Sequence, residues 1–502
     1  MAVRWRAGAA IGIASAAVAL GAAELVAVAT GAGTSPLVSV GGFVVDTVPE
    51  PVKAFAISLF GVYDKIALQV GTVVLLAAFA ALIGVAATRD IRYGYAGIGL
   101  FGVVGVAAAV SRPGASALAA VPSLVGSLLA AALLWWLLRP QPSAESEASA
   151  RSIDRRVVLG ALGAAVVAGF GGRFLATRRG VADARNAVTL PAPASVPSAV
   201  PTGSDLNLPE LARYVTSNRD FYRIDTAIVV PQVDPETWRL RIHGRVRNPM
   251  ELTFDQLLAR PMIERYVTLC CVSNEVGDKL ISNARWLGVP VKDLLDEAQP
   301  LDGADQVVSR SADRWTCGTP TAILRDGRDA MLAVGMNGEP LPVEHGFPVR
   351  MVTPGLYGYV SACKWLVELE LSSFADFDAY WVRRGWAAQG PIKTQSRIDV
   401  PRRGSRVNAG RVTVAGVAWA QHRGIARVEV RVDGGIWQDA TLAETISSDT
   451  WRQWSWGWDA TPGAHRISVR ATDTTGAVQD EARRPPFPDG ATGWDTIDVT
   501  VQ

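Results

Sequence analysis

Two adjacent cysteines, Cys270 and Cys271, end a short apolar run in the stretch "RYVTLCCVSNEVG" (265–277). The chain of 502 residues holds only four cysteines, so this pair is not the product of a sulfur-rich composition. A thiolate is a soft metal ligand, but a free thiol has a pKa of about 8.5 and needs a metal or a positive field to ionise at neutral pH. Cys271 stands at the end of an expected strand, where its side chain can reach a cleft.

Two disulfide bonds are the competing interpretation, because an oxidising compartment pairs free thiols. Neighbouring residues of a strand point to opposite faces, so Cys270 and Cys271 would need partners on opposite sides. The spacing also lacks the CxxC pattern of a zinc ribbon or an iron–sulfur cluster. A single thiolate remains compatible with a metal that is held mainly by a non-protein group. The other two cysteines are Cys317 and Cys363.

The composition divides the chain in two. Residues 1–180 are rich in Ala, Gly, Val and Leu, whereas residues 200–502 hold most of the Arg, Asp, Trp and Pro. This division predicts a membrane part followed by a water-soluble part. The formal net charge of +2 gives no general basic footprint, so we expect no nucleic-acid partner.

The membrane part (1–180) contains five apolar segments near the length of about 20 residues that a spanning helix needs. Three basic loops, at the N-terminus, at 88–92 and at 151–156, fall on one side if all five segments span. The positive-inside rule then predicts a multi-pass protein of the cell membrane with a cytoplasmic N-terminus and the large C-terminal part outside. The five segments are Gly8–Thr30, Ile66–Thr88, Tyr93–Val110, Ala115–Leu138 and Val157–Ala176.

Three further features belong to this part. Arg155 and Arg156 before the fifth segment are similar to a twin-arginine export signal, which carries folded proteins, although they also suit the positive-inside rule alone. Glu24 within the first segment is a functional candidate, or a solvated group at the outer interface. No histidine precedes His243, so paired imidazoles cannot hold a haem in these helices, and we expect none.

The water-soluble part begins with a Pro- and Ala-rich linker at 181–209, which we expect to be an extended tether. Residues 210–388 mix strands and helices, which indicates an α+β domain. Within it, "TFDQLLAR" (253–260) predicts a short helix with Thr253 as its cap.

The last segment, 389–502, reads as strands alone, which predicts a β-sandwich of immunoglobulin type. Asp433-Gly434 marks a hairpin turn. The row of Trp454, Trp456 and Trp458 lies on one face at period two and is more typical of a core than of a ligand site.

Longer motifs in the soluble part carry a family resemblance. "YVTLCCVSN" and "MNGEPLPVEHGFPVRMVTPGLYGYVSACKWL", with the strand pattern after them, resemble the sulfite oxidase family of molybdenum enzymes over roughly 205–500. The helical front end is not part of the core family and looks like a membrane anchor. The resemblance implies a molybdopterin-binding catalytic domain followed by a β-sandwich that the family uses for dimerisation. A homodimer through the sandwich is one expectation, and a different assembly dictated by the membrane helices is the alternative.

The family implies a molybdenum bound to one molybdopterin and to a single cysteine thiolate. The alignment of "TLCCVSN" makes Cys271 that ligand and the catalytic residue, with Cys270 as a core thiol. An anionic cofactor phosphate suits an arginine and a lysine. The cofactor contacts that the resemblance implies are Tyr222, Arg223, Asp313, Cys317, His345, Arg350, Ser361, Ala362, Cys363 and Lys364.

Departures from the family pattern concern the substrate. Members that oxidise sulfite carry arginines after the ligand cysteine, whereas this chain has Asn274, Glu275 and Val276 there. The arginine of the entry segment is also shifted, since Ile224 and Asp225 follow Arg223. Trp386 replaces a tyrosine near the metal, and only Arg383 or Arg384 remains to compensate for the missing charge.

We therefore predict a membrane-anchored molybdenum oxidoreductase that transfers an oxygen atom, with two electrons, to or from a small sulfur-containing substrate. A separate electron carrier, a cytochrome or a quinone-linked protein, is expected. One alternative is a reductase of sulfoxides, such as oxidised methionine, with the same cofactor. The other is a non-catalytic cell-surface binding protein.

Overall fold

The structure is a computed structural model, and it divides the chain into two compact units. The first comprises Met1–Gly180 with Ala227–Val230, and the second comprises Val181–Thr226 and Pro231–Gln502. The residues described are 2–30, 34–48, 52, 64–111, 117–139, 181–227 and 229–502, together with 160, 163, 167, 169 and 171.

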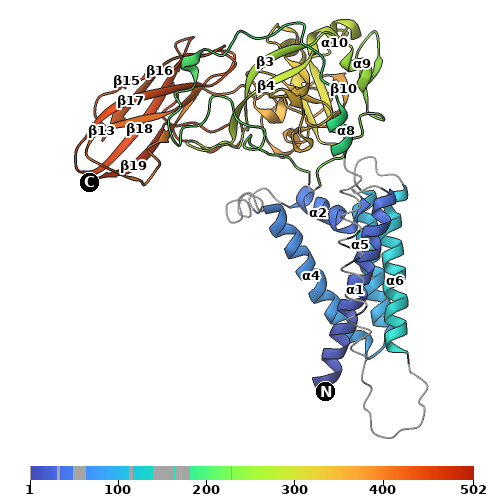
Figure 1. The fold of residues 1–502 in the computed structure, drawn as a ribbon. Coiled ribbons are helices and arrows are strands. Elements are labelled where there is room, and N and C mark those ends of the chain that lie inside the picture. Colours follow the sequence, from blue (N-terminus) through green and yellow to red (C-terminus); the bar gives the residue numbers. More distant parts are fainter. Residues whose placement is uncertain are drawn as a thin grey trace. The chain divides into compact units, whose positions relative to one another are not determined.

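The first unit is helical. In its described part, four helical segments are long and apolar enough to cross a membrane, as four of the five predicted segments require. The fifth predicted segment, 157–176, lies mainly outside the described residues. Helix α1 packs against both α4 and α6 (Figure 1). The helices are α1 (Ala2–Thr30), α2 (Pro36–Thr47), α4 (Asp64–Ala87), α5 (Ile91–Val110) and α6 (Val121–Leu138), with the 3-10 turn η3 (Ala117–Ala120) before α6.

In this bundle the large apolar side chains point outward and the small residues lie between the helices, which is the reverse of the arrangement in a water-soluble protein. Leu82, Leu100 and Leu128 point outward and are 64–72% exposed. Glycines lie between the helices, and a Cβ on Gly12 of α1 would come 1.9 Å from the carbonyl oxygen of Ala80 on α4. Close helix contact through small residues, with large apolar side chains outside, is the pattern of helices packed in hydrocarbon.

The second unit begins with two sheets. One has the strand order β2-β1-β10-β5-β6, and the other has the order β3-β4-β7-β8 with β9 paired to β7. The strands are β1 (Arg239–Gly244), β2 (Met250–Thr253), β3 (Ile263–Cys270), β4 (Ile281–Pro290), β5 (Gln306–Ser311), β6 (Thr316–Pro320), β7 (Met331–Met336), β8 (Glu339–Pro340), β9 (Arg350–Val352) and β10 (Leu366–Ser372).

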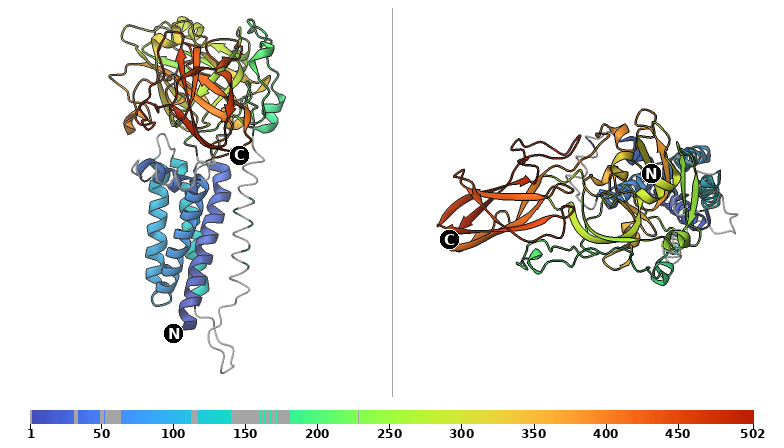
Figure 2. Two further views of the ribbon diagram at one scale, coloured as in Figure 1. Left: turned by 90° about the vertical axis from the view of Figure 1, so that its left-hand side faces the viewer. Right: turned by 90° about the horizontal axis from the view of Figure 1, so that it is seen from above.

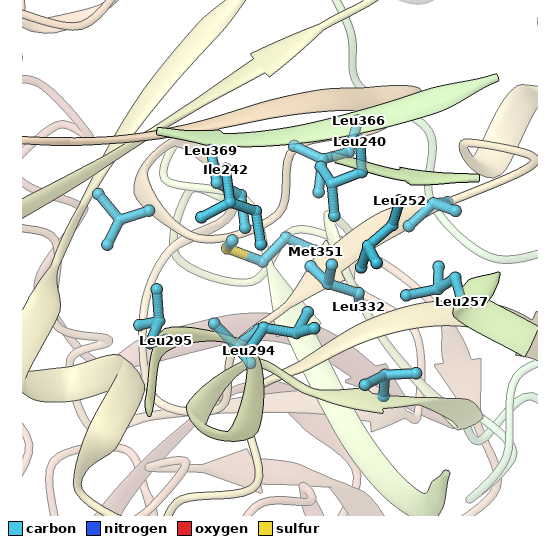
Figure 3. Close-up of a cluster of buried hydrophobic side chains, with 14 of the residues drawn as sticks. Leu240, Ile242, Leu252, Leu257, Leu294, Leu295, Leu332, Met351, Leu366 and Leu369 are labelled. Atoms are coloured by element: carbon cyan, nitrogen blue, oxygen red, sulfur yellow. The ribbon is translucent and has the colours of Figure 1, made fainter. Parts of the chain in front are cut away.

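A hydrophobic core joins these two sheets. Leu240 of β1 and Leu369 of β10 meet Met351 of β9 and Leu294 of helix α10 (Val291–Ala298), as Figure 3 shows. The predicted helix near 253 is confirmed as α9 (Phe254–Leu258), which opens with a capping box at Thr253. The core fixes the position of β9, which carries Arg350 at its start.

The segment predicted to be an extended tether contains a short helix and bonds to the second unit. After helix α8 (Ala182–Ala187), Ser195 accepts a hydrogen bond from the amide of Glu264 at 2.8 Å. Further along, the amide of Leu206 donates to Oε1 of Gln453 at 2.7 Å. The segment 181–209 therefore belongs to the second unit, because its backbone bonds along the surface of that unit.

The C-terminal β-sandwich is confirmed (Figures 1 and 2). Its sheets have the orders β11-β13-β17-β16 and β12-β19-β18-β14-β15. Asp433 and Gly434 have φ values of 52° and 71°, which the predicted hairpin turn requires. Trp454 and Trp458 are buried in the core, as predicted. The strands are β11 (Gln395–Val400), β12 (Arg406–Val407), β13 (Gly410–Trp419), β14 (Ile425–Val432), β15 (Gln438–Asp439), β16 (Thr441–Leu442), β17 (Arg452–Ala460), β18 (Gly463–Asp473) and β19 (Asp495–Val501).

Candidate cofactor site

The loop after β3 holds the predicted metal ligand. Cys271 is the first residue beyond the strand, and its amide donates to the carbonyl oxygen of Leu280 at 2.9 Å. Asn274 closes the loop, since its amide donates to the carbonyl oxygen of Cys271 and its Oδ1 accepts from the amide of Leu280 at 2.7 Å. Burial raises the pKa of the Cys271 thiol, although hydrogen bonds with Ser273 oppose the rise.

The two-disulfide interpretation is wrong. All four cysteines are free thiols. Cys270 is 1% exposed and packs in a hydrophobic cluster with Ile281 and Tyr357. Burial raises its pKa well above the ordinary value. The pair therefore consists of one thiol in a core and one at the start of a folded loop.

The segment 345–350 packs tightly against Lys364. It begins in the 3-10 turn η5 (Val343–His345), and Gly346 follows with a φ of +112°, which favours glycine. A Cβ on Gly346 would lie 3.0 Å from the Cβ of Arg350 and 3.1 Å from the backbone of Lys364. Glycine at this position thus lets the two predicted cationic contacts approach each other.

Arg350 is a buried cation. Its side chain stacks on the ring of Trp286, with the guanidinium carbon 5.0 Å from the ring centroid. Nη1 donates to the carbonyl oxygen of His345 at 3.1 Å, and Nη2 donates to that of Ala362 at 3.4 Å. Among the residues that the structure describes, no carboxylate lies within ion-pair distance of it.

Burial without a counter-ion is costly for Arg350. The residue is only 5% exposed, and desolvation lowers its pKa to about 10. The penalty for a desolvated ion is several kcal/mol unless an opposite charge compensates. A buried guanidinium without a carboxylate partner therefore suits an anion such as a phosphate.

His345 lies beside Arg350 in its neutral form. The residue is 3% exposed, and burial together with the positive charge of Arg350 lowers its pKa to about 4. Nε2 lies 2.9 Å from the carbonyl oxygen of Asn218, so this nitrogen carries the proton and donates. Nδ1 is then left as an acceptor in the neutral ring.

Lys364 is partly neutralised by Asp225. Its Nζ lies 2.8 Å from Oδ2 of Asp225 and also donates to the carbonyl oxygen of Glu344. Burial lowers the pKa of Lys364 to about 8, while Asp225 opposes this shift. Arg223 shares the same carboxylate oxygen at 3.1 Å, so Asp225 bridges two of the predicted contacts.

Tyr222 lies close enough to both Arg350 and the cysteine pair to interact with them electrostatically. Burial raises the pKa of its phenol, and the nearby thiol of Cys271 adds to the rise while Arg350 opposes it. A Cβ on Gly358 would lie 3.7 Å from each of the Tyr222 hydroxyl, the Cys270 carbonyl oxygen and the Cβ of Ala362. The absent side chain of Gly358 thus leaves room among these three groups.

Four further predicted contacts bond or pack within the protein itself. Cys317 and Cys363 are fully buried in the main hydrophobic core. The Ser361 hydroxyl donates to carbonyl oxygens within its own loop, and Oδ1 of Asp313 accepts from the amide of Trp315. Their contacts with a cofactor stay predictions.

The arginines considered as replacements for the missing positive charge are held within their own segment. Nε of Arg383 donates to the carbonyl oxygen of Asp378 at 2.7 Å. The guanidinium of Arg384 lies 3.6 Å from the ring centroid of Tyr380. Trp386 packs edge-on against Phe487, with ring centroids 5.4 Å apart.

Sequence reasoning missed Trp286, Asn218 and Gly358. Trp286 supplies the surface on which Arg350 stacks, and its position within the apolar strand β4 gives no signal of that role. Asn218 acts through its backbone oxygen, which the residue type does not reveal. Only Gly358, between two tyrosines, offers a hint, because a glycine there permits close approach.

Comparisons with known proteins identify relatives of both parts of the second unit. Residues 227–381 match the family described as "Oxidoreductase molybdopterin binding domain", and residues 395–469 match "Bacterial Ig domain". The sulfane dehydrogenase SoxCD from Paracoccus pantotrophus has a similar fold, with a TM-score of 0.51 at 24% identity over 58% of this chain and 82% of that chain.

Two curated relatives are sulfite oxidases. That of Gallus gallus is 30% identical over 323 residues, which cover 54% of this chain and 70% of the relative. The mitochondrial sulfite oxidase of Mus musculus is 32% identical over 286 residues, covering 48% of this chain and 52% of the mouse protein, so the match spans about half of that relative. By these similarities, the chain belongs to the sulfite oxidase family of molybdopterin-binding oxidoreductases.

Proposed function

We propose that this protein is a membrane-anchored oxidoreductase that transfers one oxygen atom and two electrons between water and a small sulfur-containing substrate. Arg350 is the observation that carries the proposal, because in the described part of the protein this buried cation donates to carbonyl oxygens and stacks on an indole face without a carboxylate partner, which fits an anionic cofactor group. When bound, molybdopterin with its molybdenum supplies the redox and oxygen-transfer chemistry.

The chain's own residues bind and orient this group. Arg350 and Lys364 would hold the phosphate, and Nδ1 of His345 would offer a hydrogen-bond acceptor to the pterin. Cys271 would supply the thiolate ligand of the metal. Burial of these side chains excludes water from the charged contacts, which strengthens them.

The anchor is the helical first unit. Four apolar helical segments support membrane attachment. With the fifth predicted segment, 157–176, as a further span, the basic loops support a cytoplasmic N-terminus with the second unit outside. Electrons then pass to or from a separate carrier. We also propose that the β-sandwich mediates homodimerisation, as the family resemblance implies.

A sulfoxide reductase is the second candidate. Asp225 places a buried carboxylate between Arg223 and Lys364, which reduces the positive charge available to a dianion such as sulfite. A neutral sulfoxide does not need that charge. Purified protein assayed with artificial electron dyes should distinguish the two, since turnover of methionine sulfoxide without turnover of sulfite favours the reductase.

Replacement of Arg350 tests the proposed cofactor site directly. Arg350→Met keeps the length and packing of the side chain but removes the charged donors. We expect the molybdenum and pterin content of the purified full chain to fall by at least about tenfold, because charge-assisted hydrogen bonds to an anion are lost. Metal analysis and pterin fluorescence after extraction give the measurement.

Arg310→Met is the matched control. Arg310 already pairs with Glu368, at 2.7 Å, and with Glu370 on one sheet face, so its loss should leave the molybdenum content unchanged. Wild-type protein matured in a host that makes the cofactor, yet free of molybdenum, would refute the proposed function. Equal metal content in Arg350→Met would remove the role of this arginine.

A further inference from the structure

The first unit contains a cavity of about 190 Å³. All of its lining residues belong to the helices of this unit, with contributions from α1, α2, α4, α5 and α6. The wall is mainly apolar, formed by side chains such as Ala19, Leu76 and Phe101. A cavity of about 150 Å³ lined by apolar side chains holds one benzene molecule, so this space has the size of a substituted ring.

Two serines on the wall are chemically distinctive. Ser15 of α1 is 3% exposed, and Ser123 of α6 is 6% exposed. Both residues line the cavity, and neither hydroxyl has a hydrogen-bond partner in the described part of the protein. A buried hydroxyl without a partner is destabilising, so these positions suit a ligand that accepts hydrogen bonds.

Several other hydroxyls of the bundle bond to backbone oxygens of nearby residues. Ser127, which also lines the cavity, donates to the carbonyl oxygen of Ser123 at 2.8 Å. Thr30 likewise donates to a backbone oxygen within α1, and Thr88, just after α4, donates to the carbonyl oxygen of Val85 in that helix. Such back-bonding is the usual way in which a helix satisfies a hydroxyl, and Ser15 and Ser123 are exceptions to it.

We propose that this cavity binds the ring of a membrane-soluble quinone, with the hydroxyls of Ser15 and Ser123 as donors to its carbonyl oxygens. A quinone ring has apolar faces, which match the wall, and two acceptor oxygens at its edge. A lipid acyl chain would fill the apolar space but leave both hydroxyls unpaired. The ring with acceptors therefore accounts for both features of the cavity.

The role of a bound quinone as electron carrier rests on the proposed function, whereas its binding depends on the first unit alone. Oxidation of a sulfur substrate with an oxygen atom from water releases two electrons and two protons. A quinone takes up both and becomes the quinol, so the exchange balances. Residues 1–242 contain no histidine that could bind a haem for this purpose.

A pair of matched probes tests the proposal on the full chain in detergent. Duroquinone (tetramethyl-1,4-benzoquinone) carries the ring and the acceptors, and durene (1,2,4,5-tetramethylbenzene) carries a similar ring without them. We expect calorimetry to show saturable duroquinone binding to the wild type. Ser15→Ala with Ser123→Ala should weaken duroquinone binding by about tenfold, because two hydrogen bonds are lost, and leave durene binding unchanged.

Ser127→Ala is the matched control, since this hydroxyl lines the same cavity but already has a partner. It should bind duroquinone as the wild type does. No saturable duroquinone binding to the wild type, or unchanged binding to the double variant, would overturn the proposal. The same protein prepared without molybdenum cofactor should bind equally, which separates this result from any failure of the proposed function.

Discussion

Single residues set the charge of the site. Arg223, Arg350 and Lys364 contribute three cationic groups near one another, and Asp225 supplies one carboxylate. Arg350 is the cation without an ion-pair partner, since it contacts neutral groups in the described structure. A cofactor phosphate therefore has a defined place, while the region around Lys364 is less positive.

His345 should make the cofactor-free protein sensitive to acid. Its folded pKa of about 4 lies below the ordinary value of 6.5, so the unfolded chain binds more protons between these values. Stability is therefore lost as the pH falls from 6.5 towards 4, by about 2 kcal/mol at pH 5. In His345→Gln, urea unfolding of the full chain at pH 7.5 and pH 5 should show a pH-dependent loss smaller by about this amount.

His465→Gln provides a control of opposite sign. The carboxylate of Asp433, 2.7 Å from the ring, raises the pKa of His465, so this histidine contributes stability at low pH that is lost as the pH rises. Its replacement should not reduce the acid sensitivity. An unchanged pH dependence in His345→Gln would show that His345 is not buried in its neutral form.

At the scale of elements, the β-sandwich holds the loop of the candidate metal ligand. Nη1 of Arg397, on β11, donates to the carbonyl oxygen of Asp278 at 2.6 Å. Gly277 has a φ of +85°, and a Cβ there would lie 2.6 Å from Oδ1 of Asp495 on β19. Residues of two sandwich strands, β11 and β19, thus pack against one side of the loop between β3 and β4.

Arg397→Ala should loosen this loop. The arginine also pairs with Asp399 at 2.7 Å, and both side chains are nearly inaccessible, so the substitution leaves a buried carboxylate uncompensated. We expect a destabilisation of about 3 kcal/mol and faster hydrogen–deuterium exchange at 272–280. Mass spectrometry of the exchanged full chain gives both the site and the extent of the change.

Arg411→Ala serves as the comparison. Arg411 pairs with Asp459 on the sandwich surface, where both side chains are largely exposed, so its loss should change stability by less than about 1 kcal/mol. Exchange at 272–280 should stay as in the wild type. Equal exchange in the Arg397 variant would mean that the loop does not depend on the sandwich.

At the scale of the whole molecule, the two units follow opposite rules of solvation. The second unit buries its largest side chains, among them Trp238 and Trp286, whereas the first exposes large aliphatic residues and packs through glycine and alanine. Water favours the buried large side chains of the second unit, and hydrocarbon permits the exposed large aliphatic side chains of the first unit. One chain therefore contains parts suited to two solvents.

Export of the folded second unit is the whole-molecule prediction. Arg155 and Arg156, which lie outside the described residues, precede the fifth predicted apolar segment. If they form a twin-arginine signal, changing both to Lys should keep residues 181–502 inside the cell, because that route recognises the arginine pair and not charge alone. Protease added to intact spheroplasts would then fail to digest the second unit.

Arg89→Lys with Arg92→Lys is the matched change in another basic loop, and it should leave export intact. Normal protease sensitivity of the Arg155 and Arg156 variant would exclude the twin-arginine route. This outcome would not contradict the orientation predicted by the positive-inside rule, since lysine preserves the positive charge.

The sequence by itself determined the features that depend on neighbouring residues. Apolar runs located four membrane-length helices, Thr253 marked the start of a helix, and Asp433-Gly434 marked a hairpin, because such signals act within a few residues. The order of its motifs also indicated the family. These predictions hold because hydrophobic periodicity and turn chemistry are local properties of the chain.

Only the tertiary structure decided how the distant segments meet. It placed Arg350 on the face of Trp286, joined Lys364 to Asp225, and bound the segment around Ser195 to β3. It also showed that Cys317 and Cys363 lie in an apolar core. Each of these contacts joins residues far apart along the chain, and its energy depends on burial and mutual distance, which no local pattern encodes.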